Sequence, residues 1–108
     1  MEAIGANPVV GTGIKLSISM SPVNDISLKS VDWEVLVCSD KGFKKLVIPK
    51  EDAIYIDDDT YVICVDTNLI GSGRYYTIIT VYIPDDDFDK GFRLERHKSF
   101  TGVTIDPQ

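Results

Sequence analysis

An acidic run at residues 85–91, Asp-Asp-Asp-Phe-Asp-Lys-Gly, is the stretch whose residue types come nearest to a metal-binding loop. Its first, third and fifth residues have the alternate spacing with which an EF-hand calcium loop begins. However, Lys90 stands where that loop needs a glycine for its sharp turn, and Glu95 falls one residue short of the bidentate position. We therefore interpret the run as a solvated turn and predict no metal ligand. A second acidic turn at residues 57–59 keeps a calcium-binding module open as an alternative.

Cys38 and His97 have the residue types of a nucleophile and its base, but no local pattern brings them together and no third residue would orient the histidine. Hydrolysis by paired carboxylates needs two separated acids in one cleft, whereas the aspartates here gather in turns. We expect His97 on the surface of an edge strand. The sequence predicts a protein that is not an enzyme, with no catalytic residue and no cofactor.

Tyrosines form the other chemically notable set, because exposed aromatic rings can make a platform for a sugar. Trp33 is the single tryptophan and is expected to be buried, so core or sheet-covering roles are favoured for the aromatic residues. A carbohydrate-binding β-sandwich module of a cell-surface or secreted protein remains the alternative function, beside the calcium-binding one. The tyrosines are Tyr55, Tyr61, Tyr75, Tyr76 and Tyr82.

The composition describes one globular domain of ordinary hydrophobicity. The chain has 108 residues, of which 44% are hydrophobic and 26% charged. The net charge of −6 argues against a nucleic-acid partner, since phosphate binding needs clustered lysine and arginine. No apolar stretch has the length of a membrane span, and residues 1–12 lack the pattern of a secretory signal. We therefore predict no membrane insertion.

Two cysteines, Cys38 and Cys64, permit at most one disulfide. They fall on separate predicted strands, on the faces expected to be less buried, and no flanking pattern brings them together. Metal sites need several close cysteine or histidine ligands, which the sequence does not provide. We expect both thiols to stay reduced and to pack as small buried hydrophobes.

Residues 74–84, Arg-Tyr-Tyr-Thr-Ile-Ile-Thr-Val-Tyr-Ile-Pro, are the element around which the chain is organised. Nearly all are β-branched or aromatic, with glycines before the run and a proline at its end. Both faces are apolar, which is typical of a central strand covered on both sides. One face carries Tyr75, Ile79, Val81 and Ile83, and the other carries Tyr76, Ile78 and Tyr82.

Alternating patterns predict six further short strands, separated by turn residues, and at most one short helical turn. Such spacing is typical of an all-β, two-sheet sandwich of about seven strands, here predicted as one domain over residues 13–106 after a flexible arm at residues 1–12. By fold analogy, strands one, two and five form one sheet and strands three, four, six and seven the other. The other strands are predicted at residues 14–20, 31–39, 43–48, 53–56, 60–66 and 92–99, with 103–105 continuing the last after a kink at Gly102.

The same alternation predicts the most buried residues, because one side of each strand must face the core. The predicted core residues are Leu16, Ile18, Trp33, Val35, Ile63, Tyr75, Ile79 and Val81.

The sequence resembles two known groups of proteins, the first through a short stretch and a tryptophan. Residues 69–75, Leu-Ile-Gly-Ser-Gly-Arg-Tyr, resemble the tyrosine corner at the sixth strand of fibronectin type III domains, and Trp33 resembles the buried tryptophan of that family. Both cysteines follow Trp33, so the pairing that brackets the tryptophan in immunoglobulins is absent, and the resemblance implies the immunoglobulin-like sandwich without its disulfide.

A second resemblance spans residues 13–105. The runs Val-Gly-Thr-Gly-Ile-Lys-Leu, Ile-Tyr-Ile-Asp-Asp-Asp-Thr-Tyr and Ile-Pro-Asp-Asp-Asp-Phe-Asp-Lys-Gly-Phe-Arg are similar to small immunoglobulin-like proteins from phage and prophage structural regions of gut bacteria. This resemblance implies a virion-associated protein of the tail or baseplate type, made in the bacterial cytoplasm and then carried in the virion. It transfers no catalytic residue.

A two-sheet sandwich buries only one face of its central strand, so Tyr76, Ile78 and Tyr82 are expected to point outward. Neighbouring strands are expected to add Phe43, Phe92 or Leu94 to that side, and contiguous exposed apolar surface marks interaction sites. We predict that these three residues bind a protein partner or a second copy of the chain. The alternative is that the arm at residues 1–12 covers them.

Overall fold

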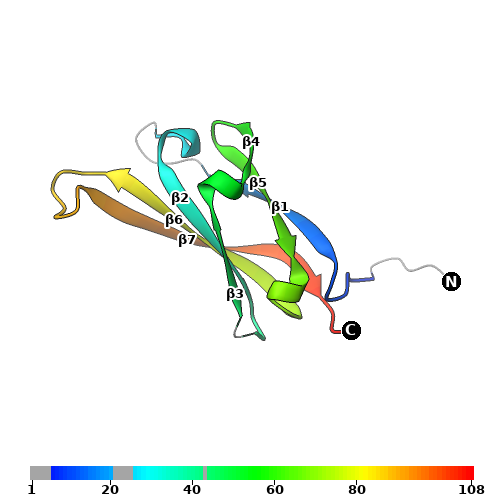
Figure 1. The fold of residues 1–108 in the computed structure, drawn as a ribbon. Helices are drawn as coiled ribbons and strands as arrows, with labels where there is room; N and C mark the ends of the chain where they lie inside the picture. The colour runs from blue at the N-terminus through cyan, green and yellow to red at the C-terminus, as the bar shows by residue number, and fades with distance from the viewer. Residues whose placement is uncertain (1–5, 21–25, 43) are drawn as a thin grey trace.

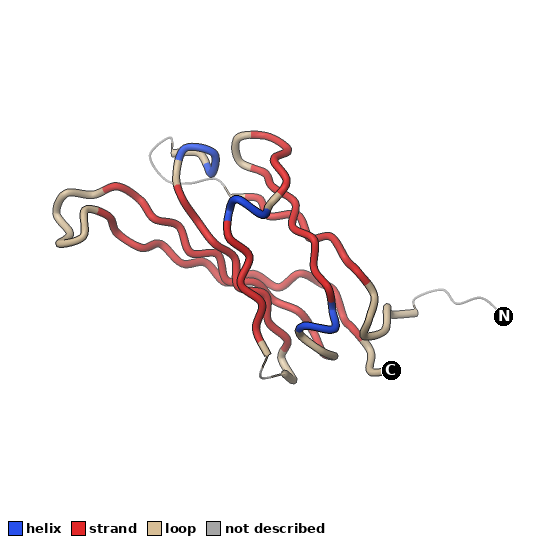
Figure 2. The backbone as a smooth tube through the Cα atoms, in the orientation of Figure 1, coloured by secondary structure: helices blue, strands red, loops and turns tan. Residues whose placement is uncertain are grey.

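The computed structural model describes residues 6–20, 26–42 and 44–108. Its strands form two sheets, with the orders β1-β5-β4 and β3-β2-β6-β7, and every strand pair is antiparallel (Figure 1). The all-β, sandwich-like architecture expected from the sequence is confirmed, with strands along most of the chain (Figure 2). The strands are β1 (Gly13–Ser19), β2 (Asp32–Ser39), β3 (Lys45–Pro49), β4 (Ile54–Asp57), β5 (Thr60–Asp66), β6 (Gly73–Pro84) and β7 (Phe92–Ile105).

The expected assignment of strands to sheets is wrong for two of them. β2 was expected in one sheet with β1 and β5 but pairs with β6 over its whole length, and β4 was expected in the sheet of β3, β6 and β7 but pairs with β5. The chain crosses from β1 to the other sheet and then forms three successive antiparallel pairs, β2–β3, β4–β5 and β6–β7. Its later crossings lie between these pairs and not within them. The assignment made by fold analogy separated β2 from β3 and β4 from β5. Strands joined by a short turn favour the same sheet, so this assignment failed.

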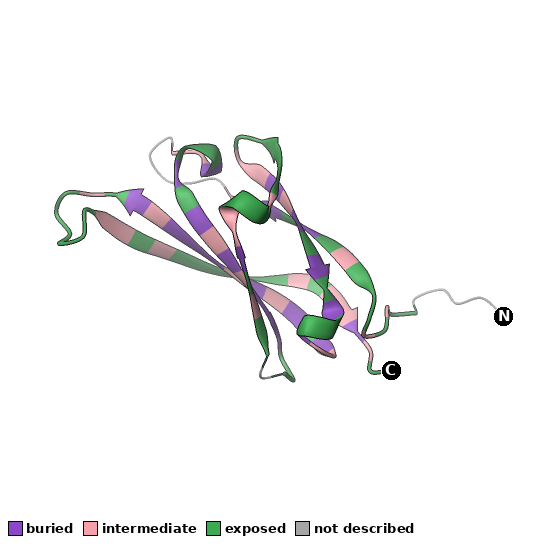
Figure 3. Cartoon of the chain, in the orientation of Figure 1, coloured by how far each residue is buried: buried purple, intermediate pink, exposed green. Residues whose placement is uncertain are grey.

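β6 is the central strand, as the sequence predicts. It pairs with β2 on one side and with β7 on the other, and its buried and half-buried residues alternate along its length (Figure 3). The predicted kink near Gly102 corresponds to a register irregularity between Arg74 and Tyr76, and Gly102 has a φ of 77°. β7 continues through this irregularity as one strand.

Among the described residues, three short 3-10 helices connect the strands, where at most one helical turn was expected. They are η2 (Leu28–Ser30), η3 (Lys50–Asp52) and η4 (Thr67–Leu69). The side chain of Ser27 caps the first and that of Asp66 caps the last. A three-residue helix is too short to carry a helical hydrophobic period, so periodicity could not detect these turns.

The core lies between the two sheets and contains all eight residues predicted to be buried. Trp33 of β2 packs edge-on against Tyr61 of β5, with ring centroids 4.9 Å apart, so the contact joins the two sheets. The indole Nε1 donates a hydrogen bond to the carbonyl of Leu28, 3.1 Å away, so the N–H group of the buried ring has a partner.

The loop into β6 depends on glycine. A side chain at Gly73 would bring its Cβ 2.1 Å from the Ser39 hydroxyl, and the φ of Gly73 is 126°, in the region that favours glycine. After this loop, the hydroxyl of buried Tyr75 donates to the carbonyl of Gly71, 2.6 Å away. The tyrosine therefore anchors the loop to the start of the central strand.

Candidate interaction surface

The outward side of the four-stranded sheet, here called the outer face, carries Tyr76, Ile78 and Tyr82 as the sequence predicts. Their neighbours Tyr75, Ile79 and Val81 belong to the core, so strand alternation turns these three residues outward. Residues that pair with them in register on the neighbouring strands lie on the same side, and each such set across the sheet is called a row. Within a row the residues are given in the strand order β3, β2, β6 and β7. From the β2–β3 turn toward the β6–β7 turn, the rows of the outer face are Lys45, Cys38, Tyr76 and Phe100; Val47, Leu36, Ile78 and Lys98; Pro49, Glu34, Thr80 and Arg96; Asp32, Tyr82 and Leu94; and Pro84 and Phe92.

Aromatic pairs lie at both ends of the outer face. At one end, the rings of Tyr76 and Phe100 lie 6.0 Å apart, and the ammonium of Lys98 lies 4.4 Å from the Tyr76 ring centroid. At the other end, the rings of Tyr82 and Phe92 meet edge-on at 5.4 Å. These contacts pack aromatic rings against one another at the surface, and aromatic residues are common at binding interfaces.

The apolar surface between these pairs stays open among the described residues. The exposed fraction is 53% for Val47, 54% for Leu94 and 70% for Phe100. The described part of the N-terminal arm, residues 6–12, does not cover them, because Val9 pairs with Asp106 in parallel and Gly11 donates to the Thr67 hydroxyl. Phe43, which was expected to contribute to this side, lies outside the described residues.

Charged residues lie along the whole outer face. Lys45 and Lys98 lie in the rows nearest the β2–β3 turn. Asp32 lies in the Tyr82 row, and the acidic turn at residues 85–91 follows directly beyond. The outer face therefore carries lysines toward one end and an aspartate toward the other, and its middle row holds both Glu34 and Arg96.

Hydrogen bonds fix the polar groups of the outer face and change the acidity of its tyrosines. The hydroxyl of Tyr82 donates to Glu34, 3.0 Å away, and this bond, followed by burial, raises the pKa of the phenol. A hydrogen bond to the side chain of Cys38 raises the pKa of Tyr76. Both phenols keep a polar donor at the surface, and the raised pKa values extend their protonated form further into alkaline solution.

The acidic turns are organised by their own backbone rather than as a metal cage. Asp85 accepts from the N–H of Asp87 and lies 3.6 Å from Arg93, while Asp57 accepts from the N–H of Asp59. Figure 1 shows the two turns well apart, one after β6 and the other between β4 and β5. Over residues 6–20, 26–42 and 44–108, no three histidine, cysteine or acidic side chains are grouped so that they could hold a metal ion.

Cys38 and His97 lie on opposite sides of the larger sheet. Cys38 pairs in register with Tyr76 on the outer face, whereas His97 pairs with inward-facing Ile79. The imidazole Nε2 lies 3.0 Å from Glu95, and His97 is exposed on edge strand β7, as expected. The geometry therefore separates the two residues that could have formed a nucleophile and base.

The tyrosines do not form one aromatic platform. Tyr61 and Tyr75 are buried in the core, and only Tyr76 and Tyr82 share the outer face. Tyr55 is exposed on β4, where its hydrogen bond to Asp58, 2.6 Å long, raises the pKa of its phenol to about 12.

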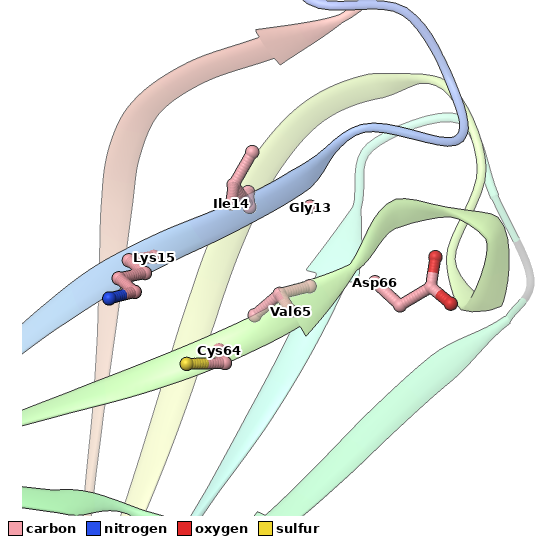
Figure 4. A pocket seen from close by; sticks show the side chains of 6 residues that line it. All are labelled: Gly13, Ile14, Lys15, Cys64, Val65 and Asp66. Atoms are coloured by element: carbon pink, nitrogen blue, oxygen red, sulfur yellow. The ribbon is translucent and has the colours of Figure 1, made fainter.

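A shallow depression of about 470 Å³ lies on the smaller sheet, where Gly13 leaves space beside Asp66 (Figure 4). The exposed side chain of Cys64 lies beside Lys15, its partner in register. The depression is open and shallow, and its polar groups do not converge on a common point in Figure 4, so it has no feature of an enclosed ligand site.

Both cysteines are free thiols on separate sheets, in agreement with the expected absence of a disulfide. The expected burial is wrong for Cys64, which is exposed, and correct for Cys38, which is buried although it lies on the outward side of β2. Large neighbours across the strands, Tyr76 on one side and Lys45 on the other, cover this small side chain.

No protein-family model, no curated protein and no solved structure matches the chain. The fold and the surface geometry define a two-sheet, all-β protein with an open, partly apolar face on its larger sheet. Within the described ranges, no helix has the length and apolar character needed to cross a membrane.

Proposed function

We propose that the chain is a non-enzymatic assembly module that makes protein–protein contacts through its outer face. The observation that carries this proposal is the open apolar surface around Ile78, bordered by the exposed side chains of Val47, Leu94 and Phe100. Contiguous apolar surface of this kind marks an interaction site. Tyr76 and Tyr82 favour a protein partner, because tyrosine offers a large contact area together with a polar group.

An immunoglobulin-like identity for the sandwich is part of the proposal. It is supported by the core tryptophan Trp33 on a strand next to the central one and by the Tyr75 hydroxyl bonded to the Gly71 carbonyl, as in a tyrosine corner. The sequence resemblance to phage structural proteins supports a virion-associated setting of the tail or baseplate type. In that setting the protein is made in the bacterial cytoplasm and then assembled into the particle.

Lysine substitution of Ile78 tests the proposed surface. Ile78→Lys places a charge in the middle of the apolar rows, and its half-exposed position allows the strand to keep its pairing. We expect an unchanged circular dichroism spectrum together with a loss, by about tenfold or more, in co-purification with a product of a neighbouring gene.

Ile56→Lys is the matched control, because Ile56 is 55% exposed on β4 of the other sheet. The control is expected to co-purify as the unsubstituted chain does. The proposal fails if folded Ile78→Lys captures the same partner as before, or if only Ile56→Lys loses it.

A further inference from the structure

The four strands that border the two sheets differ in how well they are protected against pairing with a further strand (Figure 1). Border strands are usually protected by brevity, proline, irregular register or charges that point inward. β4 has four residues and an irregular register, and β3 has five residues and ends at Pro49. On β7, Arg93, Glu95 and His97 pair in register with core residues of β6, so these side chains point inward. Each of these three strands therefore has a feature that opposes a further neighbour.

β1 has none of these features. Its seven residues, Gly-Ile-Lys-Leu-Ser-Ile-Ser, contain no proline and one charged side chain, Lys15. Its pairing with β5 is regular over the whole strand. Among the described residues, no strand pairs with its other side. β1 therefore presents a regular open edge, which is a template for strand pairing.

Two hydrogen bonds at the ends of β1 show which backbone groups point to this open edge. The carbonyl of Thr12 accepts from the N–H of Thr67, and the N–H of Met20 donates to the carbonyl of Asp59, with N···O distances of 3.4 and 3.2 Å. In an antiparallel pair, the backbone groups of alternate residues point to the same side. The even-numbered residues from 12 to 20 therefore face β5. The N–H and C=O groups that point away from β5 belong to Gly13, Lys15, Ser17 and Ser19.

From this geometry we propose that β1 pairs antiparallel with β1 of a second copy of the chain, about a two-fold axis that passes through the sheet at Leu16. In this register Gly13 faces Ser19 of the second copy, and Lys15 faces its Ser17. All of these residues have backbone groups at the open edge, so the two strands form about eight hydrogen bonds. Every contact occurs twice, as an isologous interface requires. The three-stranded sheets of the two copies then join into one continuous sheet.

Charge and strand length select this register over its neighbours. Hydrogen bonding requires odd-numbered residues to face odd-numbered ones, so the axis falls at Lys15, Leu16 or Ser17 if most of the strand is to pair. An axis at Lys15 brings the two lysines face to face, which is unfavourable. An axis at Ser17 leaves the ends of both strands unpaired. With the axis at Leu16, every residue of β1 is paired and each lysine lies opposite a serine.

The inner side of the open edge has room for the side chains that the second strand brings. A hollow of about 350 Å³ lies there, with Leu16 and Ile18 of β1 on one side and Ser99 and Val103 of β7 on the other. In the proposed register, Ile14 of the second copy lies beside Ile18, and the two Leu16 side chains meet at the axis. Apolar cross-strand pairs stabilise antiparallel strands, so these contacts favour a second copy as the occupant.

Charge substitutions at Ser17 test the register in sedimentation experiments on the purified chain. We expect a dimer at about 200 μM in physiological salt. Ser17→Lys opposes lysines at two symmetric positions and should raise the dissociation constant about fivefold or more, with an unchanged circular dichroism spectrum. Ser17→Glu forms two cross-strand ion pairs and should lower the dissociation constant about threefold. Lys15→Glu with Ser17→Lys exchanges the charges and should restore the dimer.

Ile56→Lys is the matched control, because it adds the same charge at the far border of the same sheet, where Ile56 is 55% exposed. It should leave the dissociation constant of the dimer unchanged. Ile78→Lys, which tests the outer face, should also leave it unchanged, since the outer face belongs to the other sheet. The proposed function and this inference therefore fail separately.

Amide hydrogen exchange identifies the paired edge directly. In dilute solution the amides of Lys15 and Ser17 should exchange fast and those of Leu16 and Ile18 slowly, because only the latter two face β5. At concentrations where the dimer forms, Lys15 and Ser17 should gain protection of about tenfold or more. The inference is overturned by a chain that stays monomeric at about 200 μM. It is equally overturned by a dimer in which these two amides gain no protection, or by one that Ser17→Lys and Ser17→Glu affect alike.

Discussion

Tyr75 shows how a single side chain fixes the loop that precedes the central strand. Its ring is buried, while its hydroxyl reaches back to the carbonyl of Gly71. Burial raises the pKa of the phenol, so the hydroxyl remains a donor well above neutral pH. The resemblance of residues 69–75 to a tyrosine corner implies such an arrangement, and its residues are local in the chain.

Tyr75→Phe removes that hydroxyl and leaves a backbone carbonyl without its partner. We expect the free energy of unfolding, measured by urea titration, to fall by about 0.5–1.5 kcal/mol, the usual contribution of one hydrogen bond. Tyr55→Phe is the control, since its hydroxyl bonds Asp58 at the exposed edge of β4 and water can replace the bond. Equal losses for the two variants would contradict the role assigned to Tyr75.

Cys38 illustrates a residue whose burial does not follow from the face on which it lies. Alternation correctly placed it opposite the core residues Trp33, Val35 and Val37. Its burial depends on the size of the side chains beside it on β3 and β6, which are distant in sequence. Periodicity reports the face on which a residue lies, but burial on an outward face is set by cross-strand neighbours.

At the scale of the element, the register of β6 decides which of two adjacent isoleucines supports the fold. Ile79→Ala should lower the free energy of unfolding by about 2–4 kcal/mol, because it leaves a cavity between the sheets. Ile78→Ala deletes the same atoms from the half-exposed outer face and should cost less than about 1 kcal/mol. Urea titrations of the two variants make the comparison, and similar losses would mean that the two faces are assigned backwards.

The order of strands in the sheets was harder to predict than the strands themselves. Alternation and turn residues located each element, and β5 has the predicted bounds, Thr60–Asp66. The assignment of β2 and β4 failed because it followed an analogy to a fold rather than the turns that join β2 to β3 and β4 to β5. Local patterns determine strands, whereas sheet membership depends on contacts between distant segments.

The candidate surface was predictable to a similar extent. Tyr76, Ile78 and Tyr82 follow from the alternation of one strand, and the same alternation along residues 92–100 signals that Leu94, Lys98 and Phe100 share a side. Placing these residues beside β6 required the register of β6 with β7. The lysines toward one end of the outer face and the aspartate toward the other emerge only from the strand register, since the net charge of the chain hides them.

For the whole molecule, the contact between Trp33 and Tyr61 links the stability of one sheet to that of the other. Trp33 is the single tryptophan, so its fluorescence reports the packing between the sheets, while far-UV circular dichroism reports the strands of both. Neither sheet has another core to pack against, because the described buried apolar residues form one cluster that both sheets share. We therefore expect a single cooperative transition in urea with the same midpoint by both signals. In Ile79→Ala both curves should shift together to lower urea, since a cavity between the sheets weakens both. A fluorescence transition that clearly precedes loss of the dichroism signal would show that the sheets separate before they unfold.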